Sequence, residues 1–334
     1  MAPSVADARE PRTSADELQL AAGLSEFDRS VIRMLQRDGR RPIAQIAREL
    51  RTAPKTVRRR IQELREAGII DITTITDPAL LGYRWLALLG LKTDGSRPLA
   101  AIAGELARVN SVDYVVLTTG RYDIFIELVC RDRSALLACI ESEVRCVAGI
   151  SSVEIHPYLR LHYQRPHFTY TPHLPQNGDH GIEPAPPLDE IDKGVILELN
   201  RDGRLSFQDV ARTLSVSEAL IRARYKRLTA HRVVRVMALT NPLSLGFDTM
   251  AWIAIRTHPA TDRLTVADGL ASLPAVVYVA ICSGRFDIFA EVVAPSHSHL
   301  LSLISNEVDS LPGVASTEAW LYLDLHYKRL RPSL

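Results

Sequence analysis

The hexapeptide Gly-Arg-Tyr-Asp-Ile-Phe at 120–125 recurs as Gly-Arg-Phe-Asp-Ile-Phe at 284–289, an offset of 164 residues. With the same offset, Arg-Asp-Gly-Arg at 37–40 recurs unchanged at 201–204, and Leu-His-Tyr at 161–163 recurs at 325–327. The two copies align without a gap over about 140 residues. A repeat of this length is a duplicated multidomain unit and not a solenoid of short repeats.

The region around the first hexapeptide predicts a small α/β domain. Apolar residues with period 2 or 3.6 predict, in order, a strand at 85–91, a helix at 99–106, strands at 112–118 and 124–129, a helix at 136–144 and a strand at 153–161. Residues 119–123 form a hairpin-type turn between the two middle strands. This β-α-β-β-α-β order is the ferredoxin-like arrangement. One face of such a sheet needs a cover, and we expect the second copy to supply it as a pseudo-two-fold pair.

The part of each copy before this domain predicts three short helices. The apolar stripes are Phe27, Val31 and Leu35; Ile43, Ile46, Ala47 and Leu50; and Val57, Ile61 and Leu64. Ser25 is a capping signal, Asp38 and Gly39 end the first helix, and Pro54 suits the first turn of the third. Two helices joined by a tight turn behind a supporting helix match the helix-turn-helix plan. The predicted fold class is therefore α+β: two copies of a winged-type helix-turn-helix domain plus a ferredoxin-like domain.

The third helix of each trihelical unit is rich in cations. Residues 51–66 and 215–232 each carry an excess of four positive charges, although the whole chain has a net charge of only +1. Such a helix fits the major groove of duplex DNA, where Arg binds guanine and other cations neutralise phosphates. The predicted DNA-binding residues are Lys55, Thr56, Arg58, Arg59, Arg60, Arg222, Arg224 and Lys226. A solvated basic helix is the alternative, and Arg60 and Arg224, which lie beside the buried stripe, are candidates for a partly structural role.

These patterns divide the chain into six segments. We expect a disordered arm at 1–22, a DNA-binding domain at 23–76, an effector and assembly domain at 77–163, a Pro-rich linker at 164–187, and a second pair of domains at 188–240 and 241–330. The linker holds His167, His173 and His180, for which solvent-exposed histidines are the alternative to a metal site.

The remaining composition argues against several other classes of protein. The four cysteines, Cys130, Cys139, Cys146 and Cys282, lack the paired spacing of a disulfide framework or a metal site, so we expect buried apolar side chains, no metal and no cofactor. An apolar run of 18 residues and a signal-peptide core are both lacking, and we expect a cytoplasmic protein without a membrane partner.

With these features the chain resembles the leucine-responsive and asparagine-responsive (Lrp/AsnC) regulators. The resemblance rests on the trihelical unit, a hinge at 73–83 and the α/β unit with its Gly-x-Tyr/Phe-Asp turn, and it covers nearly the whole chain. It implies duplex DNA as a partner, self-association into dimers or higher oligomers, and a small-molecule effector such as an amino acid near the glycine-bearing turn. By this resemblance the effector-binding candidates are Gly120, Tyr122, Asp123, Gly284, Phe286 and Asp287. Alternatively, the two glycines only permit a positive φ in a hairpin.

The chain departs from the family pattern in ways that make its two readers unequal. We use "reader 1" for the trihelical unit of the first copy and "reader 2" for that of the second. Ala53 stands where the family usually places a capping hydroxyl, whereas Ser217 keeps it. Arg51 and Ser215 replace the small residue common in the preceding turn. An asymmetric DNA site follows as a hypothesis.

Two other functions fit the same fold. Siroheme decarboxylases look like these regulators and also occur as fused pairs, so an enzyme is one alternative. His162 and His326 recur in both copies, but a packed histidine in a strand is more common than a catalytic one. A sensing or scaffold protein without DNA binding is the other alternative. No catalytic motif stands out, and the sequence predicts no catalytic residue and no enzyme activity.

Overall fold

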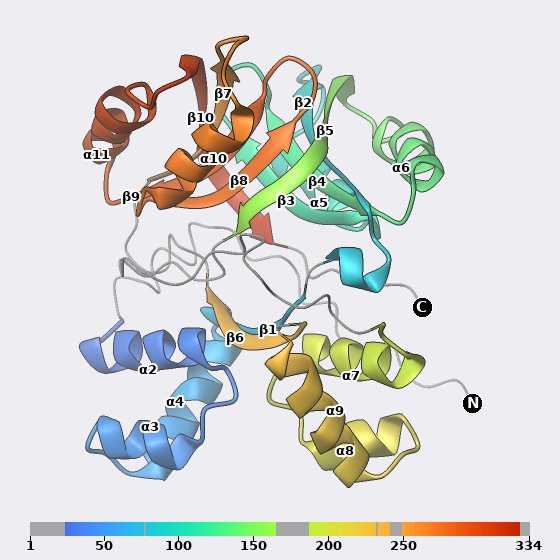
Figure 1. The fold of residues 1–334 in the computed structure, drawn as a ribbon, viewed down its shortest axis with the longest axis vertical. Helices are drawn as coiled ribbons and strands as arrows, with labels where there is room; N and C mark the ends of the chain where they lie inside the picture. The colour runs from blue at the N-terminus through green and yellow to red at the C-terminus, as the bar shows by residue number, and fades with distance from the viewer. Residues whose placement is uncertain (1–23, 77, 165–186, 232, 241–248, 328–334) are drawn as a thin grey trace.

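The computed structural model describes residues 24–76, 78–164, 187–231, 233–240 and 249–327. The predicted arm at 1–22 and most of the Pro-rich linker with its three histidines lie outside these ranges. So do Pro242 and Gly246, the counterparts of Pro78 and Gly82 at the offset of 164. Two trihelical readers lie at one end of the molecule, and a β-barrel flanked by helices lies at the other (Figure 1).

Each reader consists of the three helices that the apolar stripes predict. Reader 1 contains α2 (Glu26–Arg37), α3 (Ile43–Glu49) and α4 (Pro54–Glu66), and reader 2 contains α7 (Glu190–Arg201), α8 (Phe207–Thr213) and α9 (Glu218–Ala230). A capping box begins α2 at Ser25 and another begins α7 at Asp189. In both boxes the side chain and backbone of two residues satisfy each other's free groups at the helix start.

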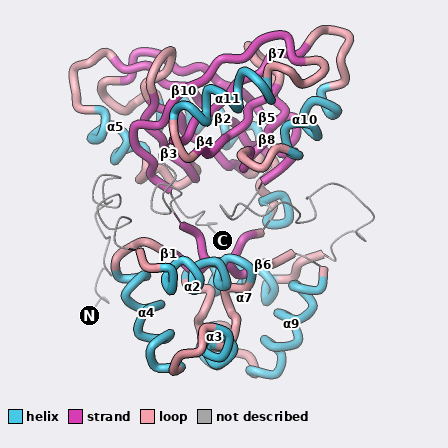
Figure 2. The backbone as a smooth tube through the Cα atoms, turned by 90° about the vertical axis from the view of Figure 1, so that its left-hand side faces the viewer, coloured by secondary structure: helices cyan, strands magenta, loops and turns pink. Residues whose placement is uncertain are grey.

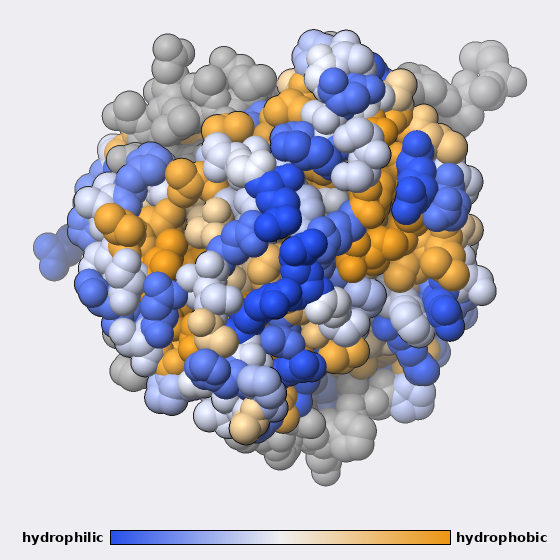
Figure 3. Space-filling view, turned by 90° about the horizontal axis from the view of Figure 1, so that it is seen from above, coloured by the Kyte–Doolittle hydropathy of each residue, from blue (hydrophilic) through white to orange (hydrophobic). Residues whose placement is uncertain are grey.

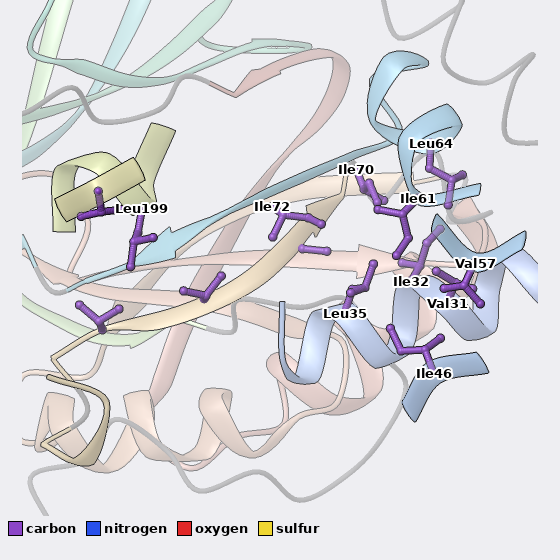
Figure 4. Packing of buried hydrophobic residues seen from close by; sticks show 14 of the residues in the cluster. Val31, Ile32, Leu35, Ile46, Val57, Ile61, Leu64, Ile70, Ile72 and Leu199 are labelled. Carbon is purple, nitrogen blue, oxygen red and sulfur yellow. The ribbon is translucent and has the colours of Figure 1, made fainter. Parts of the chain in front are cut away.

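A two-stranded antiparallel ribbon joins the two readers. Strand β1 (Ile70–Ile75) follows α4, and strand β6 (Arg235–Thr240) follows α9. They pair in register from Ile70 opposite Thr240 to Ile75 opposite Arg235, and the ribbon crosses between the readers and the barrel (Figure 2). One apolar cluster extends through both readers, and its members include Ile72 of the ribbon and Leu199 of α7 (Figure 4). The readers therefore share one core.

The barrel contains one β-α-β-β-α-β unit from each copy. The first unit has β2 (Trp85–Thr93), α5 (Leu99–Leu106), β3 (Val112–Thr118), β4 (Ile124–Cys130), α6 (Arg133–Cys139) and β5 (Ile150–Gln164). The second has β7 (Thr249–Thr257), α10 (Arg263–Ser272), β8 (Val276–Cys282), β9 (Ile288–Ala294), α11 (His297–Ser302) and β10 (Val314–Tyr327). A 3₁₀ turn, η1 (Pro78–Leu81), precedes the first unit.

The long final strand of each copy closes the barrel by pairing with both sheets. The strand order is β10-β3-β4-β2-β5-β8-β9-β7, so β5 joins β2 of its own copy to β8 of the other, and β10 likewise joins β7 to β3. The inner faces of the two sheets share a cluster of apolar and aromatic side chains drawn from both copies. The second copy covers the first, as the sequence predicts. The face of the molecule opposite the readers shows a hydrophilic band between apolar areas (Figure 3).

Two details differ from the sequence predictions. The helix expected at 136–144 changes at Ile140 into a π-helical turn, η2 (Ile140–Val144), and the second copy repeats this as η4 (Leu303–Val308). Of the four cysteines, three are buried, but Cys146 is exposed, so the expectation of four buried thiols is wrong for this residue.

Candidate nucleic-acid interface and ligand-binding domains

The third helix of reader 1 buries one face and exposes its cations. Val57, Ile61 and Leu64 are buried against α2 and α3, as their spacing predicts. Lys55 and Arg58 are exposed, and Thr56 is half-buried near the start of α4. The start of this helix thus presents side chains that can donate hydrogen bonds to base edges or phosphates.

Two of the predicted DNA-binding arginines have buried carboxylates as partners. Arg60 donates from Nη2 to Asp28 Oδ2 at 2.8 Å, and Arg224 donates from Nη1 to Asp189 Oδ2 at 2.6 Å and to Asp192 at 3.3 Å. Asp28 and Asp192 are almost completely buried. Burial opposes the charged form of Asp28, but hydrogen bonds from Arg60 and Ser25 outweigh it, and its pKa lies below the ordinary value. Arg60 and Arg224 therefore tie the third helix to the first helix in each reader.

The other predicted cations lie on exposed surface. Arg59 pairs with Glu63 at 3.0 Å and Arg222 with Glu218, both one turn apart on their helices. Lys226 is exposed on α9. Exposed pairs of this kind stabilise a helix by only about 0.3–0.5 kcal/mol, so a phosphate can compete for these arginines.

The turns before the third helices contain the only positive φ angles among the described non-glycine residues. Arg51 has φ 50° and Ser215 has φ 56°. The left-handed conformation costs an L-residue about 1–2 kcal/mol relative to glycine. Ser217 caps α9 by accepting from the Leu220 N–H at 3.2 Å, whereas the N-cap of α4, Ala53, forms no side-chain hydrogen bond. The expected difference between the two caps is confirmed.

Contacts between the copies hold the two readers together at the repeated Arg-Asp-Gly-Arg segments. The Gly39 N–H donates to the Val236 carbonyl at 2.9 Å, and the Gly203 N–H donates to the Ile72 carbonyl at 2.7 Å. A Cβ on Gly39 would lie 2.8 Å from the Met237 backbone. Neither glycine has a positive φ. The first helix ends at Arg37 with Asp38 as its C-cap, as predicted. Gly39 does not have the positive φ of a glycine helix stop, and its close approach to the other copy is what requires glycine.

The arginine that ends each of these segments reaches across to the other reader. Arg40 donates to the carbonyls of Gly203 at 2.6 Å and Leu205 at 3.0 Å. Arg204 donates to the carbonyls of Gly39 at 2.8 Å and Arg41 at 3.3 Å. Because a guanidinium donates several bonds in a fixed geometry, these contacts restrict how one reader can turn relative to the other.

The candidate effector turns lie between β3 and β4 and between β8 and β9. Gly120 has φ +96° and Gly284 has φ +125°, so both glycines permit a conformation that other residues rarely adopt. The Asp123 carboxylate accepts from Lys92 Nζ at 2.7 Å and from the Thr93 N–H at 2.8 Å. Its counterpart Asp287 accepts from the Thr257 N–H at 2.9 Å and pairs with Arg263 at 2.7 Å. Both aspartates thus have partners within their own copy.

The aromatic residues of these turns point into the interior that the two copies share. Tyr122 and Phe286 are each only 4% exposed, and the Tyr122 hydroxyl donates to Glu154 at 2.6 Å. The preceding arginines pair across the copies, Arg121 with Glu318 and Arg285 with Glu154, both at 2.9 Å. Each turn is therefore attached to the final strand of the other copy.

Two buried carboxyl groups in the same interior are a feature that the sequence analysis missed. Glu127 accepts from Tyr158 at 2.7 Å and from Tyr278 of the other copy at 2.5 Å. Glu291 accepts from Tyr322 at 2.6 Å and Tyr114 at 3.0 Å in the equivalent arrangement. Burial raises the pKa of Glu291 to about 7 against these hydrogen bonds, and it raises the pKa of Glu127. A single charged residue within the apolar run 124–130, repeated in the second copy, was the available signal.

The interior is not symmetric at one position of the final strands. His156 on β5 is completely buried with no hydrogen bond to either ring nitrogen within the described residues, and Trp320 occupies the equivalent place on β10. Burial lowers the pKa of His156 to about 4, so the ring is neutral at pH 7. The His156 ring lies 4.8 Å from the Phe289 ring, and Trp320 stacks on Phe289 at 6.1 Å.

The histidine of the first Leu-His-Tyr repeat has a partner in the other copy. His162, for which the sequence leaves a packed or a catalytic role open, forms a hydrogen bond between Nε2 and Asp268 Oδ1 at 2.8 Å. Within the described ranges there is no group of three or more His, Cys, Asp or Glu side chains that could hold a metal ion. No helix in the described part of the chain is long and apolar enough to span a bilayer.

Models of known protein families match most of the chain. A winged helix-turn-helix DNA-binding model matches residues 24–71, and an AsnC-type helix-turn-helix model matches residues 188–229. The Lrp/AsnC ligand binding domain matches twice, at residues 86–168 and 250–331.

Individual relatives correspond to a single copy. An uncharacterised HTH-type transcriptional regulator of Pyrococcus abyssi is 38% identical over 132 residues, which are 39% of this chain and 83% of the relative. The regulatory protein AsnC of Escherichia coli is 26% identical over 132 residues, covering 39% of this chain and 87% of AsnC.

Among solved structures, the siroheme decarboxylase NirDL aligns with both copies at once. The alignment covers 91% of this chain and 93% of NirDL, with a TM-score of 0.59 and 18% identity. At this identity the likeness shows a shared fold and carries no activity over. The sequence relatives and family models together show that the chain belongs to the Lrp/AsnC family of helix-turn-helix transcriptional regulators and carries the family's ligand-binding domain twice.

Proposed function

We propose that this chain regulates transcription by binding duplex DNA with both readers at once. The observation that carries the proposal is the pair of third helices, α4 and α9, each with exposed cations on the face opposite its buried stripe. The proposed contacts in reader 1 are Lys55, Thr56, Arg58 and Arg59, and those in reader 2 are Arg222 and Lys226. Arg60 and Arg224 serve instead to position the helices, because the buried carboxylates of Asp28 and Asp192 accept hydrogen bonds from them.

The shared core and the reciprocal arginine contacts support joint action. The β1–β6 ribbon, Arg40 and Arg204 connect the readers directly. A DNA site that meets one reader would therefore meet the other at a set spacing and orientation. One fused chain takes the place of the dimer that reads two half-sites in many helix-turn-helix proteins.

DNA-binding measurements with matched variants test this proposal. Fluorescence anisotropy with duplex from upstream of the gene, between 50 and 200 mM salt, should give an affinity that falls steeply with salt. Each phosphate contact contributes about 0.9 to the slope of log K against log salt. Lys55→Ala combined with Arg58→Ala should lower both the affinity and the slope. Arg145→Ala, which removes an exposed cation from the barrel domain, is the control. Salt-independent or undetectable binding would favour the scaffold or enzyme alternatives.

We further propose that a small molecule, such as an amino acid or related metabolite, modulates this binding through the ligand-binding domains. The turns at Gly120 and Gly284 are the proposed sites, and each contacts the final strand of the other copy. A ligand at a turn would bias the contact between copies, the association of chains, and hence the presentation of the readers. Adding each amino acid to the DNA-binding assay is the test. If none changes the affinity, and none raises the melting temperature, amino acids are not the effector.

A further inference from the structure

The starts of α4 and α9 occupy equivalent positions in the duplication but present opposite chemistry. Reader 1 presents Lys55, Thr56 and Arg59. At the offset of 164, reader 2 presents Ala219, Leu220 and Ala223. In both readers the first and third of these residues are exposed and the second is half-buried. The pattern of exposure is thus the same in the two readers, and the chemistry of the side chains differs.

We call the first six residues of α4 and of α9 the tips of the readers. Both tips contain one equivalent arginine, Arg58 in reader 1 and Arg222 in reader 2, and its surroundings differ between the readers. Arg222 donates from Nε to Glu218 at 3.0 Å, and its guanidinium lies 5.3 Å from the centre of the Phe207 ring. The equivalent Arg58 has Pro54 and Ile43 where reader 2 has Glu218 and Phe207. Arg222 is therefore oriented and partly neutralised, whereas the tip of reader 1 contains no carboxylate at this position.

Base pairs differ in what they offer to such surfaces. In the major groove, Lys and Arg donate to the O6 and N7 atoms of guanine, whereas apolar side chains contact the methyl group of thymine. The tip of reader 1, with Lys55 and Arg59, therefore matches base pairs that contain guanine. The tip of reader 2, with Ala219, Leu220 and Ala223, matches base pairs that contain thymine.

We propose that the chain reads a non-palindromic duplex site: reader 1 recognises guanines through Lys55 and Arg59, and reader 2 recognises thymine methyl groups through Ala219, Leu220 and Ala223. This inference rests on the proposed DNA binding. Because the ribbon and the arginine contacts hold the readers together, the two unlike halves lie at a set spacing.

The test begins with selection of binding sites from a random duplex library by the full chain. The selected site is then resynthesised with deoxyuridine for thymidine, which removes only the methyl group, in one half at a time. Loss of one buried methyl weakens binding about fourfold. We expect this loss in the half that reader 2 occupies and less than a twofold change in the other. Replacing guanine by 7-deazaguanine should weaken binding only in the half of reader 1.

A variant identifies which reader occupies which half. Lys55→Ala, Thr56→Leu and Arg59→Ala together give reader 1 the tip of reader 2, and the selected site should become a repeat of the thymine-dependent half. Circular dichroism and melting show whether this variant folds, and the base-analogue measurements on the unaltered chain do not depend on it. A palindromic selected site, or equal sensitivity to deoxyuridine in both halves, would overturn the inference while leaving DNA binding intact. If no sequence is enriched and binding is independent of salt, the proposed function itself fails.

Discussion

The substitution Gly39→Ala is expected to loosen the connection between the two readers. Its Cβ would lie 2.8 Å from both Cα and N of Met237 and 3.0 Å from the Val236 carbonyl carbon. These are backbone atoms, so strand β6 must move, and the 2.9 Å hydrogen bond from Gly39 to Val236 must lengthen. Overpacking costs about 1–3 kcal/mol and a lost hydrogen bond about 1 kcal/mol. Alanine restricts the unfolded chain and returns about 0.4–1 kcal/mol, which leaves a net destabilisation of about 1–3.5 kcal/mol.

Two spectroscopic signals separate the readers from the barrel in this experiment. The three tryptophans, Trp85, Trp252 and Trp320, all lie on barrel strands, so their fluorescence follows the barrel, while far-UV circular dichroism also follows the reader helices. In urea, Gly39→Ala should shift the circular dichroism transition to lower concentration more than the fluorescence transition. DNA binding should become less sensitive to a half-turn insertion between the two halves of the site.

The control for this prediction is Gly104→Ala. Gly104 lies in α5, and a Cβ there meets nothing within 4 Å, so this variant should be as stable as the original chain or slightly more stable. If Gly39→Ala left both transitions and the spacing dependence unchanged, the close contact at β6 would not be what couples the readers.

Three further predictions concern single side chains. Asp192→Asn should destabilise reader 2 by about 2–4 kcal/mol in urea denaturation, because it removes the buried charge that pairs with Arg224 and Arg227. The control Glu190→Gln, at an exposed pair, should change stability by less than about 0.5 kcal/mol. Equal effects of the two substitutions would refute the stabilising role of the Asp192 charge. Glu291 keeps its proton up to about pH 7 when folded but loses it near its ordinary pKa when unfolded, so its contribution is fully present below pH 4.5 and is lost as pH rises to 7, by about 3 kcal/mol. The free energy of unfolding of the original chain minus that of Glu291→Gln should therefore fall by about 3 kcal/mol between pH 4.5 and 7. A difference that stays constant over this range would contradict the raised pKa. Arg51→Gly should raise the melting temperature by relieving the positive φ, while Thr52→Gly should lower it; a loss of stability in both would show that Arg51 is not strained.

The periodicity of the sequence predicted the elements because each of them buries one apolar face. The apolar stripe of Val57, Ile61 and Leu64 predicted the third helix, and the alternation of apolar residues in 85–91 predicted β2. The duplication predicted that the sheets would cover each other, since neither sheet can leave an apolar face in water. These predictions depend on the spacing of apolar residues within each element, which does not depend on contacts with the other copy.

The functions of single polar residues depended on contacts that periodicity does not describe. Arg60 and Arg58 are two residues apart on one basic helix, yet Arg60 reaches a buried Asp28 on another helix while Arg58 is exposed. Gly39 follows a helix end, but the backbone of β6, about 200 residues later, decides why it is glycine. The tyrosine partners of Glu127 come from both copies, and only the closed barrel brings them together.

In the proposed function, the exposed cations of α4 and α9 contact duplex DNA. The most direct measurement of this contact is photo-cross-linking to the selected duplex from a photoreactive residue placed at position 58, 222 or 145 in otherwise unaltered chains. We expect cross-links from positions 58 and 222, each mapping to a different half of the site, and none from position 145 on the barrel domain. Cross-links from position 145 alone, or none from either third helix at a salt concentration where the chain binds the duplex, would contradict the proposed function.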